Sequence, residues 1–109
     1  MPESIERGAL TEAVYYILIS LHQPMHGYAI MQRIQELTAG RVMLGAGTLY
    51  GAINALVQKQ WIRAVPGESD SRKKEYVITE VGRGVFVAEL DRLKELLNNG
   101  ISLYEGVQR

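Results

Sequence analysis

With 109 residues, 47% of them hydrophobic and 22% charged, the chain has the composition of one small folded domain and not of a disordered segment. The absence of cysteine excludes disulfides, thiolate nucleophiles and zinc sites built on cysteine, and it fits a cytoplasmic protein. The 12 basic and 12 acidic side chains cancel, so only their distribution along the chain can indicate contact with nucleic acid.

The apolar segments are short. The longest run, at residues 13–21, has about half the length of a membrane span, and no basic segment followed by an apolar stretch opens the chain. We therefore expect neither a membrane span nor a signal peptide. Because a chain this short buries a smaller share of its surface than a larger domain does, self-association is also expected.

The first predicted helix covers residues 9–21, where apolar side chains recur at the spacing of an amphipathic helix. Pro24 and Gly27 interrupt this pattern, and a second helix is predicted over residues 27–37. His22 and His26 flank the proline without a third ligand, so we expect no metal here and expect His26 to help cap the second helix. A loop is predicted over residues 38–47.

The next stretch, "GAGTLYGAINALVQKQW" at residues 45–61, has three glycines in seven residues and then the pattern of a helix. A dinucleotide fingerprint needs a strand before its glycines, and a P-loop needs Lys-Ser or Lys-Thr after the last one. Here a helix and a loop precede Gly45, and Ala52-Ile53 follows Gly51. The glycines therefore do not indicate a nucleotide site.

The two sides of this third helix differ in chemistry. The side expected to face the body of the domain carries Leu49, Ile53, Leu56, Val57 and Gln60. The other side is small and polar, with Gly47, Thr48, Gly51, Ala55, Gln58 and Lys59, flanked by Tyr50 and Asn54. Such a face suits either a DNA major groove or the close approach of another helix, and the face alone does not decide between them.

Strand-like residues follow at 61–65 and 75–79, and the turn chemistry of "PGESDSRKK" between them predicts a long-tipped β-hairpin. Its tip holds the only run of consecutive basic residues, Arg72-Lys73-Lys74. Thr79 is a predicted N-cap for a last helix from Glu80. That helix has a heptad-like seam of apolar residues and is expected to continue, bent or frayed, through residues 98–100. The seam residues are Phe86, Leu90, Leu93 and Leu97.

Three helices, a hairpin and a long helix form the winged helix-turn-helix order. The predicted fold class is mainly α with a small β-hairpin. We expect one domain over residues 1–109, with a winged helix-turn-helix at about 9–80 and a C-terminal dimerisation helix at about 81–104. The helix that follows Gly45 is the third of the three and directly precedes the hairpin, and this position favours a role in DNA recognition.

The segments "LTEAVYYILISLHQPMHGYAIMQRI", "GAGTLYGAINALVQKQWI" and "RKKEYVITEVGR" resemble the PadR family of bacterial transcriptional regulators. The motifs are "HGY-I" at the second helix, "GTLY" at the third, and a basic-Tyr-x-x-T-x-x-G stretch after the hairpin tip. The resemblance covers about residues 9–97, and the length of the chain fits the subgroup with a single C-terminal helix.

The resemblance implies a homodimeric repressor that binds a palindromic operator. Gly47, Thr48, Leu49 and Tyr50 match the start of the family's recognition helix, the basic run matches its wing, and Tyr76 matches its strand tyrosine. In this family the last helices pair across the two-fold axis. Some short members bind flat aromatic drugs between paired tryptophans of that helix, but the only tryptophan here, Trp61, ends the third helix, so that site is not carried over.

Two sets of site residues follow. The residues expected to contact DNA are Tyr28, Gly47, Thr48, Tyr50, Gly51, Asn54, Lys59, Arg72, Lys73 and Lys74, with packing as the alternative role for Tyr28. The residues expected at the dimer interface are Tyr15, Tyr16, Phe86, Leu90, Leu93 and Leu97.

The expected partners are double-stranded DNA, a second copy of the chain and, where there is an inducer, a small aromatic ligand at the dimer cleft. No cofactor, metal or catalytic group is expected, because no nucleophile and base are brought together by any motif. Two other functions stay open: a winged-helix module that binds proteins, and a small-molecule-binding protein without DNA affinity.

Overall fold

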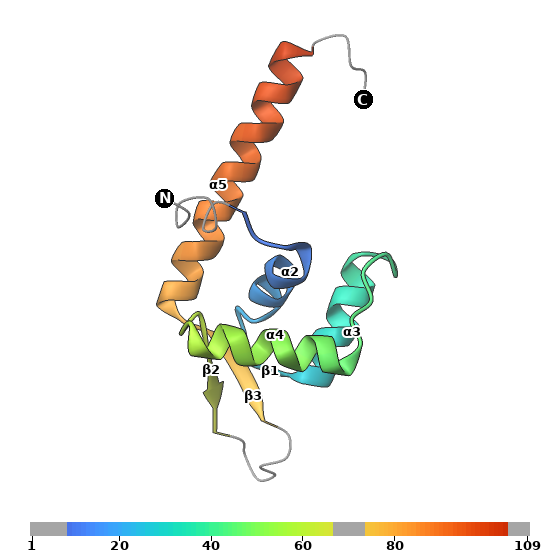
Figure 1. Cartoon of the computed structure of the whole chain (residues 1–109), viewed down its shortest axis with the longest axis vertical. Coiled ribbons are helices and arrows are strands. Elements are labelled where there is room, and N and C mark those ends of the chain that lie inside the picture. Colours follow the sequence, from blue (N-terminus) through green and yellow to red (C-terminus); the bar gives the residue numbers. More distant parts are fainter. Residues whose placement is uncertain (1–8, 67–73, 105–109) are drawn as a thin grey trace.

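The computed structural model describes residues 9–66 and 74–104. In chain order the elements are α2 (Glu12–Ser20), β1 (Met25–His26), α3 (Gly27–Leu37), α4 (Ala46–Gln58), β2 (Ile62–Val65), β3 (Glu75–Ile78) and α5 (Glu80–Leu103). The predicted class, mainly helical with a small sheet and a long last helix, is confirmed. Figure 1 shows α4 crossing the body, with α5 leaving it on the side opposite the β2–β3 hairpin.

Side-chain caps explain where two of the helices begin. Thr11 accepts a hydrogen bond from the amide of Val14 at 3.1 Å, so α2 begins at Glu12 and not at the predicted residue 9. Thr79 accepts one from the amide of Gly82 at 3.0 Å, and α5 begins at Glu80 as predicted. The second predicted helix, 27–37, matches α3.

The last helix runs without interruption through Asn98, Asn99 and Gly100 to Leu103. The expected bend or fray at residues 98–100 is therefore absent, and α5 is a single helix of 24 residues. No helix within the described ranges combines the length and the apolar character needed to cross a membrane.

The sheet has three antiparallel strands in the order β1-β3-β2, and not the two of the predicted hairpin. The extra strand, β1, pairs Met25 with Tyr76 and His26 with Glu75. A strand of two residues is too short to show an alternating pattern, which is why the sequence did not predict it. Its pairing joins the start of α3 to the hairpin.

The core lies where the helices meet the sheet. Its buried side chains are Ile17, Leu18, Leu21, Ile30, Ile34, Leu49, Ile53, Leu56, Ile62, Tyr76, Ile78 and Phe86. The inner side of α4 was predicted correctly for its leucines and isoleucine, but Gln60 is exposed. Because α4 ends at Gln58 and Gln60 has a φ of 67°, Gln60 is no longer on the helical side that faces the core.

Candidate nucleic-acid interface

The outer face of α4 is exposed along its whole length. Its exposed residues are Gly47, Thr48, Tyr50, Gly51, Asn54, Ala55, Gln58 and Lys59. A Cβ added at Gly47 or Gly51 would meet no atom within 4 Å, so open space lies above both glycines. The face is therefore small, polar and uncovered by the rest of the chain, as a helix that enters a groove of DNA needs to be.

Tyr50 does more than flank this face. Its ring packs directly over Gly27, the first residue of α3, and a Cβ at Gly27 would overlap the ring and its hydroxyl. Tyr50 is still 43% exposed, so one edge of the phenol remains open to solvent. The recognition helix predicted from the sequence is thus held against the preceding helix by a glycine–tyrosine contact.

Tyr76 of β3 adds a second phenol to this corner of the molecule. Its side chain is buried in the core, and burial, followed by the proximity of Tyr50, raises the pKa of the Tyr76 phenol above its ordinary value. Tyr76 is therefore neutral at physiological pH. The strand tyrosine is thus part of the core, while Tyr50 is the phenol that reaches the surface.

Tyr28 lies on α3 and is 60% exposed. Its hydroxyl accepts a hydrogen bond of 3.5 Å from Nε2 of Gln32, one turn further along the helix. This contact leaves most of the phenol in solvent, beside the first turn of α3.

The basic residues expected to contact DNA lie at two places. Lys74 is exposed at the start of β3, whereas Arg72 and Lys73 fall outside the described residues. Lys59 caps the C-terminal end of α4, and its Nζ lies 5.0 Å from the centre of the Trp61 ring. Lys59 is therefore held at the hairpin end of α4 by a cation–π contact.

Neither histidine forms a site. Nδ1 of His22 lies 2.7 Å from the carbonyl oxygen of Ile19. His26 occupies the N-cap position of α3 but makes no side-chain hydrogen bond there, so the predicted capping role is not fulfilled. Across residues 9–66 and 74–104, no group of three or more His, Cys, Asp or Glu residues could hold a metal.

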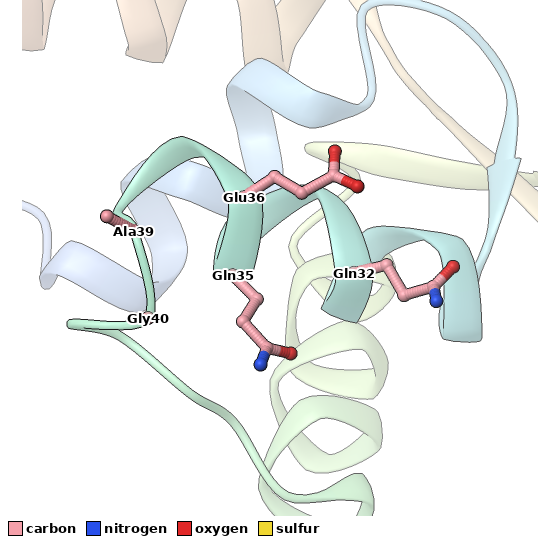
Figure 2. A pocket seen from close by; sticks show the side chains of 5 residues that line it. All are labelled: Gln32, Gln35, Glu36, Ala39 and Gly40. Atoms are coloured by element: carbon pink, nitrogen blue, oxygen red, sulfur yellow. The ribbon is translucent and has the colours of Figure 1, made fainter.

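Figure 2 shows an open polar depression of about 490 Å³ on the surface of α3, lined by Gln32, Gln35, Glu36, Ala39 and Gly40. Glu36 leaves the helix in a different direction from Gln35. The lining offers one carboxylate, amides and backbone, but no cation for a phosphate. A second depression, of about 350 Å³, is apolar and lies between Trp61 and the first turns of α5 at Val81, Gly84, Val85 and Ala88.

The residues expected at the dimer interface divide into two groups. Phe86 is 9% exposed, and its ring lies 4.9 Å from that of Tyr15 in the same chain. The rings of Tyr15 and Tyr16 are 5.3 Å apart and nearly perpendicular. Tyr15 and Phe86 therefore belong to the junction between α2 and α5 within the chain itself.

The second group lies further along α5, where the helix extends past the body (Figure 1). Its exposed apolar side chains are Leu90, Leu93, Leu96, Leu97, Ile101 and Leu103. Leu96, Ile101 and Leu103 were not among the predicted interface residues, because the predicted seam is a single heptad row that ends at Leu97. We call residues 93–103 the arm of α5.

Sequence reasoning missed the charged contact at the base of the arm. Glu89 is 5% exposed, and its carboxylate accepts hydrogen bonds from Arg92 Nε at 2.8 Å and Nη2 at 2.7 Å. It also accepts one from the amide of Leu10 at 3.3 Å. Arg92 holds the pKa of Glu89 below its ordinary value despite burial, which acts in the opposite direction. A carboxylate on the apolar side of a predicted helix, three residues before an arginine, was the available signal.

Comparison with known proteins identifies the family. The sequence profile of the "Transcriptional regulator PadR-like family" matches residues 16–88. An uncharacterized 37.1 kDa protein in transposon TN4556 of Streptomyces fradiae is 37% identical over 73 residues, which cover 67% of this chain and 20% of that protein. The chain thus spans about a fifth of this relative's length.

Solved structures agree with the profile. A transcriptional regulator from Clostridium thermocellum superposes with a TM-score of 0.72 at 25% identity, over 95% of this chain and 97% of that one. The YusO protein of Bacillus subtilis gives a TM-score of 0.75 at 22% identity, over 93% and 67% of the two chains, and shows the fold alone. The helix order, the winged hairpin and the matched residues together show that this chain belongs to the PadR-like family, a family of transcriptional regulators and not of enzymes.

Proposed function

We propose that the protein represses transcription by binding a palindromic operator in double-stranded DNA as a homodimer. The observation that carries this proposal is the outer face of α4, which is exposed and small along its length while the inner side is buried. The major groove is about 12 Å wide and admits such a helix, with its N-terminal residues against the base edges. Thr48 and Ala55 offer methyl groups to thymine, and Asn54 offers an amide to adenine.

The phosphate contacts would come from the edges of this face. Tyr28 and Tyr50 present hydroxyls near the start of α3, and Lys59 and Lys74 present cations near the hairpin. Arg72 and Lys73, which precede Lys74 in the sequence, would add two more cations. Since the outer face of α4 carries no arginine, few strong guanine contacts are available, and sequence preference would depend on methyl contacts and on DNA shape.

The arm of α5 would supply the dimer. Its leucines are exposed on one protomer, and a second copy of the same helix is the complementary surface that a two-fold axis provides. Two recognition helices on such a dimer would meet half-sites about 34–36 Å apart, one turn of B-DNA. Relief of repression by a small aromatic ligand at the cleft between the protomers is part of the proposal.

The direct test is the affinity of the purified protein for the DNA upstream of its own gene and for random DNA, across a salt series. We expect binding at dimer stoichiometry, tighter for the specific DNA by about 10³-fold or more, and weakening as salt rises. Replacing Lys59 with Ala should reduce the salt slope by about 1. Lys94→Ala, a matched change on the arm, should leave the slope unchanged.

Equal and weak binding of both DNAs at low salt would contradict the proposal. A ligand or protein partner bound tightly under the same conditions would then favour the binding-module alternatives.

A further inference from the structure

Glu89 is the only buried charged side chain in the part of the chain that the structure describes. It lies on α5 between Phe86, which packs against α2, and Leu93, where the arm begins. An apolar residue at this position would continue the stripe that packs α5 against α2.

The partners of Glu89 come from two separate parts of the fold. Arg92, three residues later on α5, binds both carboxylate oxygens, while the amide of Leu10 binds one oxygen from the segment that leads into α2. The carboxylate is therefore a link between α5 and the helical body as well as an ion pair within α5. Arg92 is partly exposed and closes the site from the solvent side.

Stability alone does not explain this arrangement. A buried ion pair contributes little net stability, because the cost of removing both charges from water offsets their attraction, and apolar replacements are often neutral or stabilising. Hydrogen bonds add direction. The distance between donor and acceptor can vary by only a few tenths of an ångström, and the donor, the hydrogen and the acceptor must lie near a straight line. Apolar contacts tolerate small sliding movements that such bonds do not.

A second set of contacts holds α5 nearer to its N-terminus. Gly82 lies directly against the carbonyl of Trp61, and the Thr79 hydroxyl donates to the carbonyl oxygens of Gln60 and Trp61 at 2.7 and 3.0 Å. These contacts join the start of α5 to Gln60 and Trp61, which follow the C-cap of α4. At a rise of 1.5 Å per residue, Glu89 lies about 10 Å beyond Gly82, and Leu103 lies about 30 Å beyond it.

Two fixed points define the direction of a rod. With the first turn of α5 held at Trp61, a shift of about 1 Å at Glu89 becomes about 3 Å at Leu103. That displacement is close to the 3.4 Å that separates neighbouring base pairs along DNA. Removing the contact of Glu89 with Leu10 would let the arm tilt about the contact of Gly82 with Trp61.

We infer that Glu89 is a positioning residue: it fixes the direction of the arm relative to α4 and thereby sets the spacing between half-sites that the dimer accepts. The inference rests on the proposed function, because spacing has meaning only for a dimer that binds two half-sites.

The first measurement needs no DNA. Because the chain has no cysteine, Gln35→Cys on α3 and Glu95→Cys on the arm give two unique spin-label sites. Labelled chains are diluted with unlabelled ones, and pulsed electron paramagnetic resonance gives the distance distribution between the two labels of one protomer. We expect one narrow distribution for the parent and a broader or displaced one in Glu89→Gln and Glu89→Leu.

The second measurement uses operators whose half-sites are moved apart or together by one and two base pairs. The parent should prefer one spacing, and both Glu89 variants should lose about fivefold or more of that preference. Glu12→Gln is the matched control, because Glu12 also pairs with both ends of a guanidinium, that of Arg41, but within the body and in solvent. It should change neither the distances nor the preference.

Glu89→Leu separates positioning from folding, because it fills the site with an apolar side chain. A role in stability alone predicts that a folded Glu89→Leu protein keeps the parental distances and spacing preference, and that result overturns the inference. Unchanged spacing preference despite altered distances also overturns it. A parent that binds none of the operators overturns the proposed function instead, whereas unchanged distances in the variants overturn only the role of Glu89.

Discussion

At the scale of single residues, the contact between Gly27 and Tyr50 decides how two helices meet. The ring of Tyr50 occupies the volume in which a side chain at Gly27 would begin. A glycine at this position is required by a neighbour and not by its own backbone, since its φ is not positive. The position of Tyr50 on α4 therefore depends on a glycine in another helix.

Gly27→Ala should destabilise the protein by about 1–3 kcal/mol, because the new methyl group forces Tyr50 from its place. Urea unfolding measures the change. Gly84→Ala is the control: it lies inside α5 with open space above it, and it should stabilise by about 0.5–1 kcal/mol. Adding Tyr50→Leu to Gly27→Ala should restore part of the loss, and failure to do so would refute steric overlap as the cause.

Glu89 gives the protein a dependence on pH that can be assigned to one residue. Because the pKa of Glu89 is lowered in the folded state, its ionised form favours folding above the ordinary glutamate range, and this contribution is lost as pH falls through the lowered value. The stability difference between the parent and Glu89→Gln should therefore shrink below about pH 4.5. Unfolding curves between pH 3 and 7 test this, and a difference that does not change with pH would contradict it.

At the scale of elements, local signals predicted what local forces determine. Thr79 as an N-cap correctly predicted the start of α5, and the spacing of Ile30 and Ile34 correctly predicted the extent of α3. Both predictions were possible because capping and amphipathic periodicity act within a few residues. The strand β1 forms only because β3 pairs with it. A pattern of two residues cannot predict pairing with a strand about fifty residues further along the chain.

The candidate site shows the same division. The outer face of α4 could be predicted because a helix wheel separates its small residues from Leu49 and Ile53. The burial of Phe86 could not, because the seam on α5 continues smoothly from the part that packs on α2 to the part that extends past it. The contact of Glu89 with Leu10 joins residues 79 positions apart, and only the folded chain brings them together.

The arm makes a prediction about self-association. Leu97→Asp should raise the dimer dissociation constant by about 100-fold, because it places a charge in the apolar seam through which the arms are proposed to pair. Val81→Asp is the control, since Val81 and Leu97 are both 56% exposed in one protomer but lie on different sides of α5. Analytical ultracentrifugation measures both. Equal effects of the two changes would mean that the seam is not the interface.

At the scale of the whole molecule, the surfaces proposed for DNA binding and for dimer formation lie on different parts of the chain. The long axis measures 56 Å, with the hairpin at one end and the arm at the other (Figure 1). A dimer that joins through the arms would leave both α4 faces uncovered, so each protomer would bind its half-site without blocking the other.

Removing one half-site should therefore reduce the affinity of the parent toward its affinity for random DNA, by about 10³-fold, while the Leu97→Asp protein should bind full and half operators nearly alike. Fluorescence anisotropy with labelled duplexes measures all four affinities. Tight binding of a half operator by the parent would show that one protomer is sufficient and would contradict a two-fold complex.

The contact of Gly82 with the Trp61 carbonyl also bears on how this protein can be recombined with its relatives. Because Gly82 lies directly against the carbonyl of Trp61 and its amide donates to the Thr79 hydroxyl, a chimaera joined where the helix begins, at Glu80, would take Gly82 from one parent and Trp61 and Thr79 from the other. The better joint lies after Arg92, because Glu89 and its partners Leu10 and Arg92 then come from one parent. An exchanged arm would then change the chain with which the protein dimerises, while the DNA sequence that α4 prefers would stay the same.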